Sequence, residues 1–127
     1  MAAPNLFSAT TATPHTVSIT PSDTSRNALV TAPSTGVAYK INQIVVSNID
    51  GTSAVDATVE LRLADGTTYR AIGSTISVPA DASLIMSDKT TMFYLLDTSV
   101  TGEASTLWAT SGTASKLTFT CSYEAIS

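Results

Sequence analysis

Few residues of this chain have the types needed for catalysis, and their spacing does not bring them together. His15 is the only histidine and Cys121 the only cysteine. One histidine beside Pro14 is a poor start for a Ser–His–Asp set, and one His with one Cys cannot build a tetrahedral zinc site. We interpret His15 as an exposed or lightly packed residue at the start of a strand. Cys121 alternates in phase with Leu117 and Phe119, which predicts a buried core residue rather than a nucleophile.

The acidic residues and the glycines show no ligand-binding pattern either. No D-x-D-x-D calcium loop is present. Asp50 and Asp56 flank one loop and could meet around a cation, but a solvated loop is the favoured interpretation. The glycines are isolated in turns and form no phosphate-binding run. A glycosidase pair of carboxylates would leave no sequence pattern, and nothing points to one. We therefore predict no enzyme, no metal and no cofactor.

The aromatic residues offer one binding hypothesis. Trp108, with Tyr69, Tyr94 and Tyr123, could form a platform on which a sugar ring stacks. Aromatic side chains of β-proteins more often pack in the core or between sheets, which is the favoured interpretation here. Trp108 is kept as a candidate interaction residue.

The elements that must position these residues are predicted to be strands. From Thr13 onward apolar residues recur with a period of two, and no helical stripe persists over ten residues. Turn residues separate the runs at intervals of about 8–12 residues, which favours an all-β antiparallel sandwich, jelly-roll or Ig-like, of about eight or nine short strands. The expected strands contain Val17 and Ile19; 28–32; 39–46; 59–63; 69–78; 83–86; 92–96; 107–109; and 117–124.

Two irregularities and one register are also predicted. The apolar residues change phase near Asn42-Gln43 and again at Gly73, and each change indicates a β-bulge. Around Asp65-Gly66, a two-residue turn would put Arg70 on the core face. A three-residue loop over 64–66, with Gly66 at positive φ, would instead pair Leu61 with Tyr69 and Glu60 with Arg70, so we expect the three-residue loop.

Residues 1–14 lack periodicity and are rich in Ala, Thr, Ser and Pro. We predict an extended N-terminal arm over 1–14 and a single β-sandwich domain over 15–127. Within the arm, Pro4, Leu6 and Phe7 are the residues expected to contact a neighbouring subunit.

The composition excludes several classes of function. Charged residues make up 13% of the 127 residues, hydrophobic ones 43%, and the net charge is −4. So few basic residues give no electrostatic footprint for nucleic acid or an anionic membrane. The first residues lack the basic segment of a secretory signal, so we expect a protein made in a reducing cytosol. About three residues in ten are serine or threonine. Such a surface can pack against neighbours without desolvating many charges, which favours assembly.

Three stretches resemble small virion structural proteins of tailed phages, especially those of marine bacteria and cyanobacteria. They are residues 44–52 (IVVSNIDGT), 76–82 (ISVPADA) and 122–127 (SYEAIS), in the same order as in that family. The resemblance spans roughly residues 38–127 and implies a virion protein without a catalytic site. It does not say which position in the virion the chain occupies.

Together these observations predict a non-enzymatic virion protein assembled in the host cytoplasm. The first hypothesis is a decoration or cement protein that bridges coat subunits through the arm 1–14 and one edge of the sandwich. Its partners would be the major capsid protein or other virion proteins, and we expect a homo-oligomer, trimeric or larger, with no nucleic acid or membrane partner. A neck or tail component is the alternative, and a carbohydrate-binding head fibre or adhesin is a third.

Overall fold

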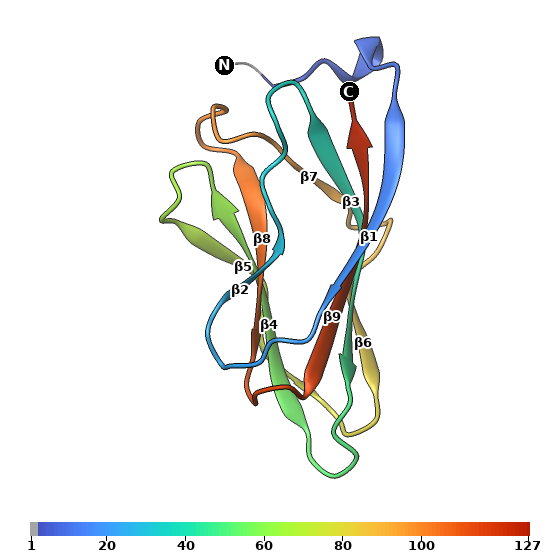
Figure 1. Cartoon of the computed structure of the whole chain (residues 1–127), viewed down its shortest axis with the longest axis vertical. Helices are drawn as coiled ribbons and strands as arrows, with labels where there is room; N and C mark the ends of the chain where they lie inside the picture. The colour runs from blue at the N-terminus through green and yellow to red at the C-terminus, as the bar shows by residue number, and fades with distance from the viewer. Residues whose placement is uncertain (1–2) are drawn as a thin grey trace.

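The computed structural model describes residues 3–127, over which nine strands form two antiparallel sheets packed face to face (Figure 1). The predicted β-sandwich is therefore confirmed. The first sheet contains β1 (Ala12–Ile19), β9 (Leu117–Ile126), β3 (Ala38–Asn48) and β6 (Ser83–Ser87), in that order, with β7 (Phe93–Leu95) also paired to β3. The second sheet contains β2 (Asn27–Val30), β8 (Ala104–Ser111), β4 (Val55–Leu63) and β5 (Tyr69–Val78). None of the described residues lies in a helix long and apolar enough to span a membrane.

The strand order decides between the two sandwich types that the sequence left open. The chain alternates between the sheets, so that β1, β3 and β9 lie in one sheet while β2, β4 and β8 lie opposite. β6 and β7 follow one another along the same side of β3 and together take the place of one strand. The orders β1-β9-β3-β6 and β2-β8-β4-β5 are those of a jelly roll. An Ig-like sandwich instead has its first and second strands in the same sheet.

The core lies between the two sheets and is built from the alternating residues of both. Its largest fully buried side chains include Phe119, Ile41, Ile44 and Leu107. Cys121 is buried among them as a free thiol, as predicted, and burial raises its pKa to about 12. A thiol with that pKa is protonated at neutral pH and is not a nucleophile.

Both predicted bulges are present. The pairing of β3 with β9 shifts between Ile41 and Gln43, and the pairing of β4 with β5 shifts on either side of the Val59–Gly73 pair. At Gly73 an added Cβ would lie 2.8 Å from the Ile76 side chain and 2.9 Å from the Met86 sulfur. The absence of a side chain at Gly73 therefore lets the bulged strand pack closely on the opposite sheet.

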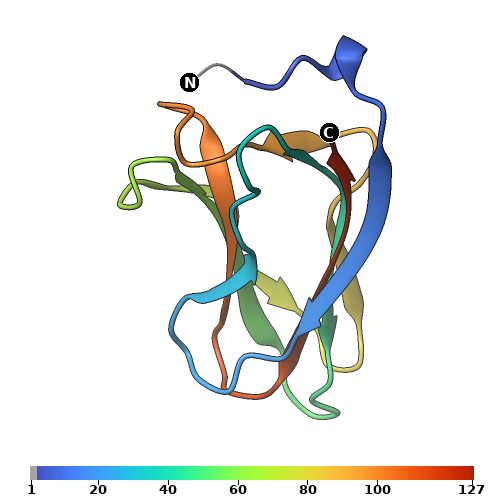
Figure 2. The ribbon, with the colours of Figure 1, turned by 45° about the horizontal axis from the view of Figure 1, so that its top comes forward.

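The predicted register of the β4–β5 hairpin is wrong. Leu61 pairs with Arg70, Arg62 with Tyr69, and Glu60 with Ala71, and the loop spans 64–67 because the Leu63 N–H donates to the Thr68 carbonyl. Gly66 has the expected positive φ of 77°. The hairpin tip projects away from the opposite sheet (Figure 2), so the inner face there is open to solvent and Arg70 stays exposed. Because Arg70 is not buried there, its charge does not disfavour this register.

One local motif shapes five of the turns. In the sequence Asp-x-Ser/Thr, the aspartate Oδ1 accepts a hydrogen bond from the backbone N–H two residues on, at 23–25, 50–52, 65–67, 88–90 and 97–99. Hydrogen bonds from side chains and these bonds from backbone N–H groups favour the ionised carboxylate and lower the pKa of each aspartate; the side-chain bonds are the larger cause at all but Asp50. For Asp65 the Thr68 hydroxyl, with two backbone N–H groups, lowers the pKa to about 2.

The N-terminal segment crosses one end of the sandwich (Figures 1 and 2). It contains a short 3-10 helix, η1 (Leu6–Ser8), which the Asn5 side chain caps by accepting from the Phe7 N–H at 3.0 Å. The N–H groups of Thr10 and Thr11 both donate to the Ser127 carbonyl at 2.9 Å. β1 begins at Ala12. Met1 and Ala2 of the predicted arm lie outside the described residues.

Candidate interaction surfaces

The first candidate surface is the outer face of β1 and β9, here called the hydroxyl face. Three cross-strand pairs of hydroxyls lie within hydrogen-bonding distance along it: Thr16–Ser122 at 3.4 Å, Ser18–Thr120 at 3.2 Å and Thr20–Thr118 at 2.8 Å. No charged residue lies in 16–20 or 118–122. Because the hydroxyls satisfy one another, this face can meet a neighbour without desolvating charges.

The second is the free edge of β1. Thr11 and Ser127 exchange two hydrogen bonds, each 2.9 Å, and the register continues without a shift from Ala12–Ile126 to Ile19–Phe119. In an antiparallel pair such doubly bonded positions alternate along the strand. Residues 13, 15, 17 and 19 therefore bond to β9, while the N–H and C=O groups of 12, 16 and 18 and the C=O of Pro14 point outward. No residue from 3 to 22 is Lys, Arg, Asp or Glu.

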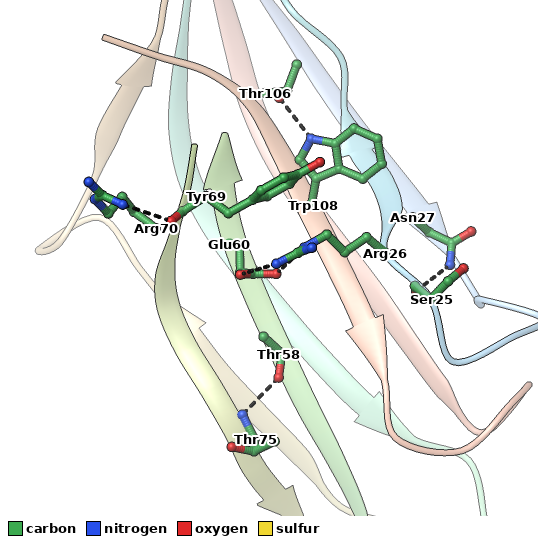
Figure 3. A network of polar contacts seen from close by, with 10 residues as sticks. All are labelled: Ser25, Arg26, Asn27, Thr58, Glu60, Tyr69, Arg70, Thr75, Thr106 and Trp108. Atoms are coloured by element: carbon green, nitrogen blue, oxygen red, sulfur yellow. Dashed lines mark hydrogen bonds and ion pairs between the residues drawn. The ribbon is translucent and has the colours of Figure 1, made fainter. Parts of the chain in front are cut away.

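The other sheet edges are shorter or interrupted. β2 has four residues, β7 three and β6 five, with a register shift between Ile44 and Val45 where β6 pairs with β3. β5 is long, but it carries two register shifts, and Thr75 within it has a φ of 47°. The Thr75 N–H donates to the Thr58 hydroxyl at 2.8 Å (Figure 3). This bond is directed toward β4 and satisfies a donor left unpaired at the bulge, and the bulges themselves keep the edge of β5 from pairing with another chain.

The third candidate surface lies on the outer face of the second sheet, and we call it the aromatic–arginine groove. Trp108 of β8 and Tyr69 of β5 meet there edge to face, with ring centroids 6.1 Å apart (Figure 3). The Trp108 indole N–H donates to the Thr106 hydroxyl at 2.9 Å. Trp108 and its cross-strand partner Glu60 lie on the outer face, whereas the preceding residue, Leu107, pairs with Leu61 and faces the core.

Two arginines cover these rings. The Arg26 guanidinium lies 3.9 Å from the centroid of Tyr69, and the Arg62 guanidinium lies 4.9 Å from that of Trp108. Arg26 also donates two hydrogen bonds to the Glu60 carboxylate, at 2.9 and 3.2 Å, and this carboxylate raises the pKa of Arg26. Within residues 3–127 Arg62 forms no ion pair, and its Nε is buried without a hydrogen-bond partner. The two arginines and Glu60 give this part of the outer face a net positive charge, while Arg26 and Glu60, which line the groove, neutralise each other.

The groove is shallow and open, with a volume of about 710 Å³. Aromatic rings, one ion pair and several hydroxyls line it: Thr24, Ser25, Arg26, Thr58, Glu60, Tyr69, Trp108 and Thr110. Planar polar groups beside aromatic rings can bind a ligand that has both hydroxyls and an apolar face. The groove contains no histidine or thiol among these residues.

The structure brings together only part of the aromatic platform considered from sequence. Tyr69 joins Trp108, but Tyr94 and Tyr123 lie in the other sheet. Tyr123 packs on Tyr39, with centroids 4.7 Å apart, and His15 stacks on it at 5.0 Å. His15 is exposed at the start of β1, as expected.

The arm residues take different positions. Pro4 and Leu6 line a groove of about 230 Å³ with Tyr94 and Leu96, so this part of the arm lies on the chain's own body. The Phe7 ring is fully exposed. Contact of Pro4, Leu6 and Phe7 with a neighbour stays a prediction.

Sequence reasoning missed the arginines of the groove. Arg62 and Glu60 alternate on β4 in phase with each other, which is a signal of a shared face. Arg26 comes from the loop before β2 and reaches Glu60 across 34 residues of sequence, so only the fold could place it.

A cation site between Asp50 and Asp56 finds no support in the described residues, where no three His, Cys, Asp or Glu side chains gather closely enough to hold a metal. Asp50 Oδ1 instead accepts from the N–H and the hydroxyl of Thr52, and its Oδ2 lies 4.0 Å from the Lys116 ammonium.

No protein-family model matches the chain, and no curated protein matches it significantly. Solved structures of infectious bursal disease virus show a limited likeness. A T=1 particle derived from this virus is 16% identical with a TM-score of 0.36, and 89% of this chain aligns with 31% of that one. The VP2 subviral particle is 17% identical with a TM-score of 0.34, and 89% of this chain aligns with 32% of that one. The chain thus spans about a third of the length of the chains it matches.

Proposed function

We propose that this chain is a non-enzymatic structural protein of a phage virion, and specifically a decoration or cement protein that joins neighbouring coat subunits. The observation that carries the proposal is the hydroxyl face bordered by the open edge of β1. Both surfaces are preformed and lack charged residues over 16–20 and 118–122, and neither has a strand partner among the described residues. A face of this kind loses little hydration free energy when a neighbour covers it.

Two further points support this role. The stretches at 44–52, 76–82 and 122–127 resemble virion structural proteins of tailed phages. Jelly rolls also occur in viral capsids, although a fold alone does not assign a function. The arm adds a second contact, because the exposed Phe7 ring is available for an apolar pocket on a coat subunit.

The test is the copy number of this chain in purified particles of the phage that encodes it, measured against the coat protein by quantitative mass spectrometry. A decoration protein follows the symmetry of the shell and is present in hundreds of copies, whereas a neck or tail component is present in about six or twelve. Fewer than about twenty copies would reject the cement role and favour the neck or tail. Absence from the particle would reject the virion role.

The aromatic–arginine groove favours a second candidate, a carbohydrate-binding head fibre or adhesin. Trp108 and Tyr69 supply apolar ring surfaces, and Glu60 with Arg26 supplies paired hydrogen-bonding groups at the same place. We expect Trp108→Ala to abolish glycan-array binding if this function holds, while Tyr123→Ala, in the other sheet, leaves it unchanged. Absence of glycan binding by the unaltered chain would reject this candidate.

A further inference from the structure

We propose that the free edge of β1 pairs with the same edge of a second copy of this chain, in an antiparallel, two-fold arrangement centred on Ser18. The inference rests on the proposed role of this edge in assembly and names its partner. A continuous sheet would then run through both copies.

The pattern of backbone groups supports a partner that is itself a strand. Thr16 and Ser18 each present an unpaired N–H and C=O on the same side of β1, two residues apart, as an added antiparallel strand requires. Pro14 has no N–H, which interrupts the edge nearer the N-terminus. The register that avoids this proline places Ser18 opposite Ser18 of the second copy and Thr16 opposite Thr20.

The side chains support a second copy rather than an unrelated chain. Thr16, Ser18 and Thr20 already pair with hydroxyls of β9. In the proposed register each would face another of the same three hydroxyls, so the ladder of hydroxyls would continue across the two-fold axis. The absence of charge from 3 to 22 means that no like charges are brought together, which a self-pairing edge requires.

The remaining edges explain why self-pairing is assigned to β1. A long, flat, uncharged edge is a template for pairing, and the described edges other than β1 are short or bulged. Val17 and Ile19 face inward from β1 and are only partly buried. Pairing with a second β1 would cover these two apolar side chains with their counterparts.

The test is sedimentation of the full chain over a range of concentrations, with two variants at Ser18. Ser18→Pro removes an outward N–H and leaves the backbone bonds to β9 in place, while Ser18→Lys places two ammonium groups together on the two-fold axis; both variants lose the Ser18 hydroxyl that pairs with Thr120. We expect the unaltered chain to dimerise, and each variant to raise the dissociation constant at least about tenfold. Ser77→Lys, on the exposed edge of β5, is the matched control and leaves the dimer unchanged.

A mixture of Ser18→Lys with Ser18→Glu tests the register itself. Opposite charges facing each other on the axis should restore a dimer that neither variant forms alone. A chain that stays monomeric at every concentration, or a dimer unaffected by both Ser18→Pro and Ser18→Lys, would overturn the proposal. A monomer that is nevertheless present in hundreds of copies per particle would overturn self-pairing and leave the decoration role standing.

Discussion

Strands β1 and β5 are the long edge strands of the two sheets, and they differ in the regularity of their pairing. β1 keeps one register over all eight of its residues, and its outward groups at Thr16 and Ser18 have no partner within residues 3–127. β5 shifts register twice, and its Thr75 N–H is bound by a side chain of the neighbouring strand. The comparison indicates that the fold protects one edge from other chains and leaves the other available.

The hairpin that ends in β5 shows how this protection arises. The bulges at Gly73 turn the strand, and the Asp65 carboxylate fixes the loop by accepting from Thr67 and Thr68. Nothing comparable interrupts β1, where the only irregular residue is Pro14. In a molecule that functions as a monomer, both edges would be expected to carry features that prevent pairing with another chain.

The largest expected effect comes from proline at adjacent positions of β1. Val17 donates its N–H to β9, whereas Ser18 directs its N–H outward, as the alternation from Thr11–Ser127 requires. Val17→Pro should lower the free energy of unfolding by about 1–3 kcal/mol because it leaves a β9 carbonyl unpaired. Ser18→Pro should change it by less. Urea denaturation measures both, and equal losses would contradict the assignment of the free edge.

A smaller effect is expected at the bulge of β5. Thr58→Val removes the hydroxyl that accepts the Thr75 N–H and should lower the free energy of unfolding by about 1 kcal/mol. The Thr75 amide should also exchange with solvent faster. Thr110→Val, on the neighbouring strand β8, is the control. Unchanged exchange at Thr75 in Thr58→Val would show that this hydroxyl does not hold the bulge.

The smallest effect is that of acid on the turns beside the two edges. Asp23, which follows β1, and Asp65, which precedes β5, both have a pKa lowered by hydrogen bonds, to about 2 for Asp65. Because the folded pKa lies below the unfolded value of 3.8, their contribution is present above pH 4 and is lost as the pH falls toward 2. Thermal unfolding between pH 5 and 2 should show a falling midpoint, with a shallower fall in Asp65→Asn. An identical fall in that variant would exclude Asp65 as a cause.

Alternation of apolar residues was enough to predict the strands, because a buried face imposes a period of two on each of them. The phase changes at Asn42-Gln43 and Gly73 likewise predicted two bulges, and Cys121 was correctly placed in the core. The β4–β5 register was not predictable in this way. It depends on the hydrogen bonds of Asp65 and on a hairpin tip that extends past the opposite sheet, where the inner face is no longer buried.

The candidate surfaces were predictable only in part. Trp108 was identified from its residue type, but its neighbours Arg26 and Arg62 come from separate segments that the topology brings together. The stretch 44–52 resembles a family motif, and the structure gives it a local role. Asn48 is buried and joins three segments by donating to the carbonyls of Ser53 and Val78 and accepting from the Asp50 N–H. Asp-x-Ser/Thr occurs seven times in the sequence, and five of these form the hydrogen-bonded turn, whereas Asp56 lies within β4 and Asp81 just before β6. The motif alone would therefore have predicted the turns only in part.

Amide hydrogen exchange along β1, followed as the protein concentration rises, tests most directly whether this edge meets another chain. At low concentration the amides of Val17 and Ile19 should be protected by β9, while those of Thr16 and Ser18 exchange rapidly. As the concentration rises, Thr16 and Ser18 should become protected, and Thr75 on β5 should not change. Rapid exchange at Thr16 and Ser18 at every concentration would contradict pairing of β1 with a second copy.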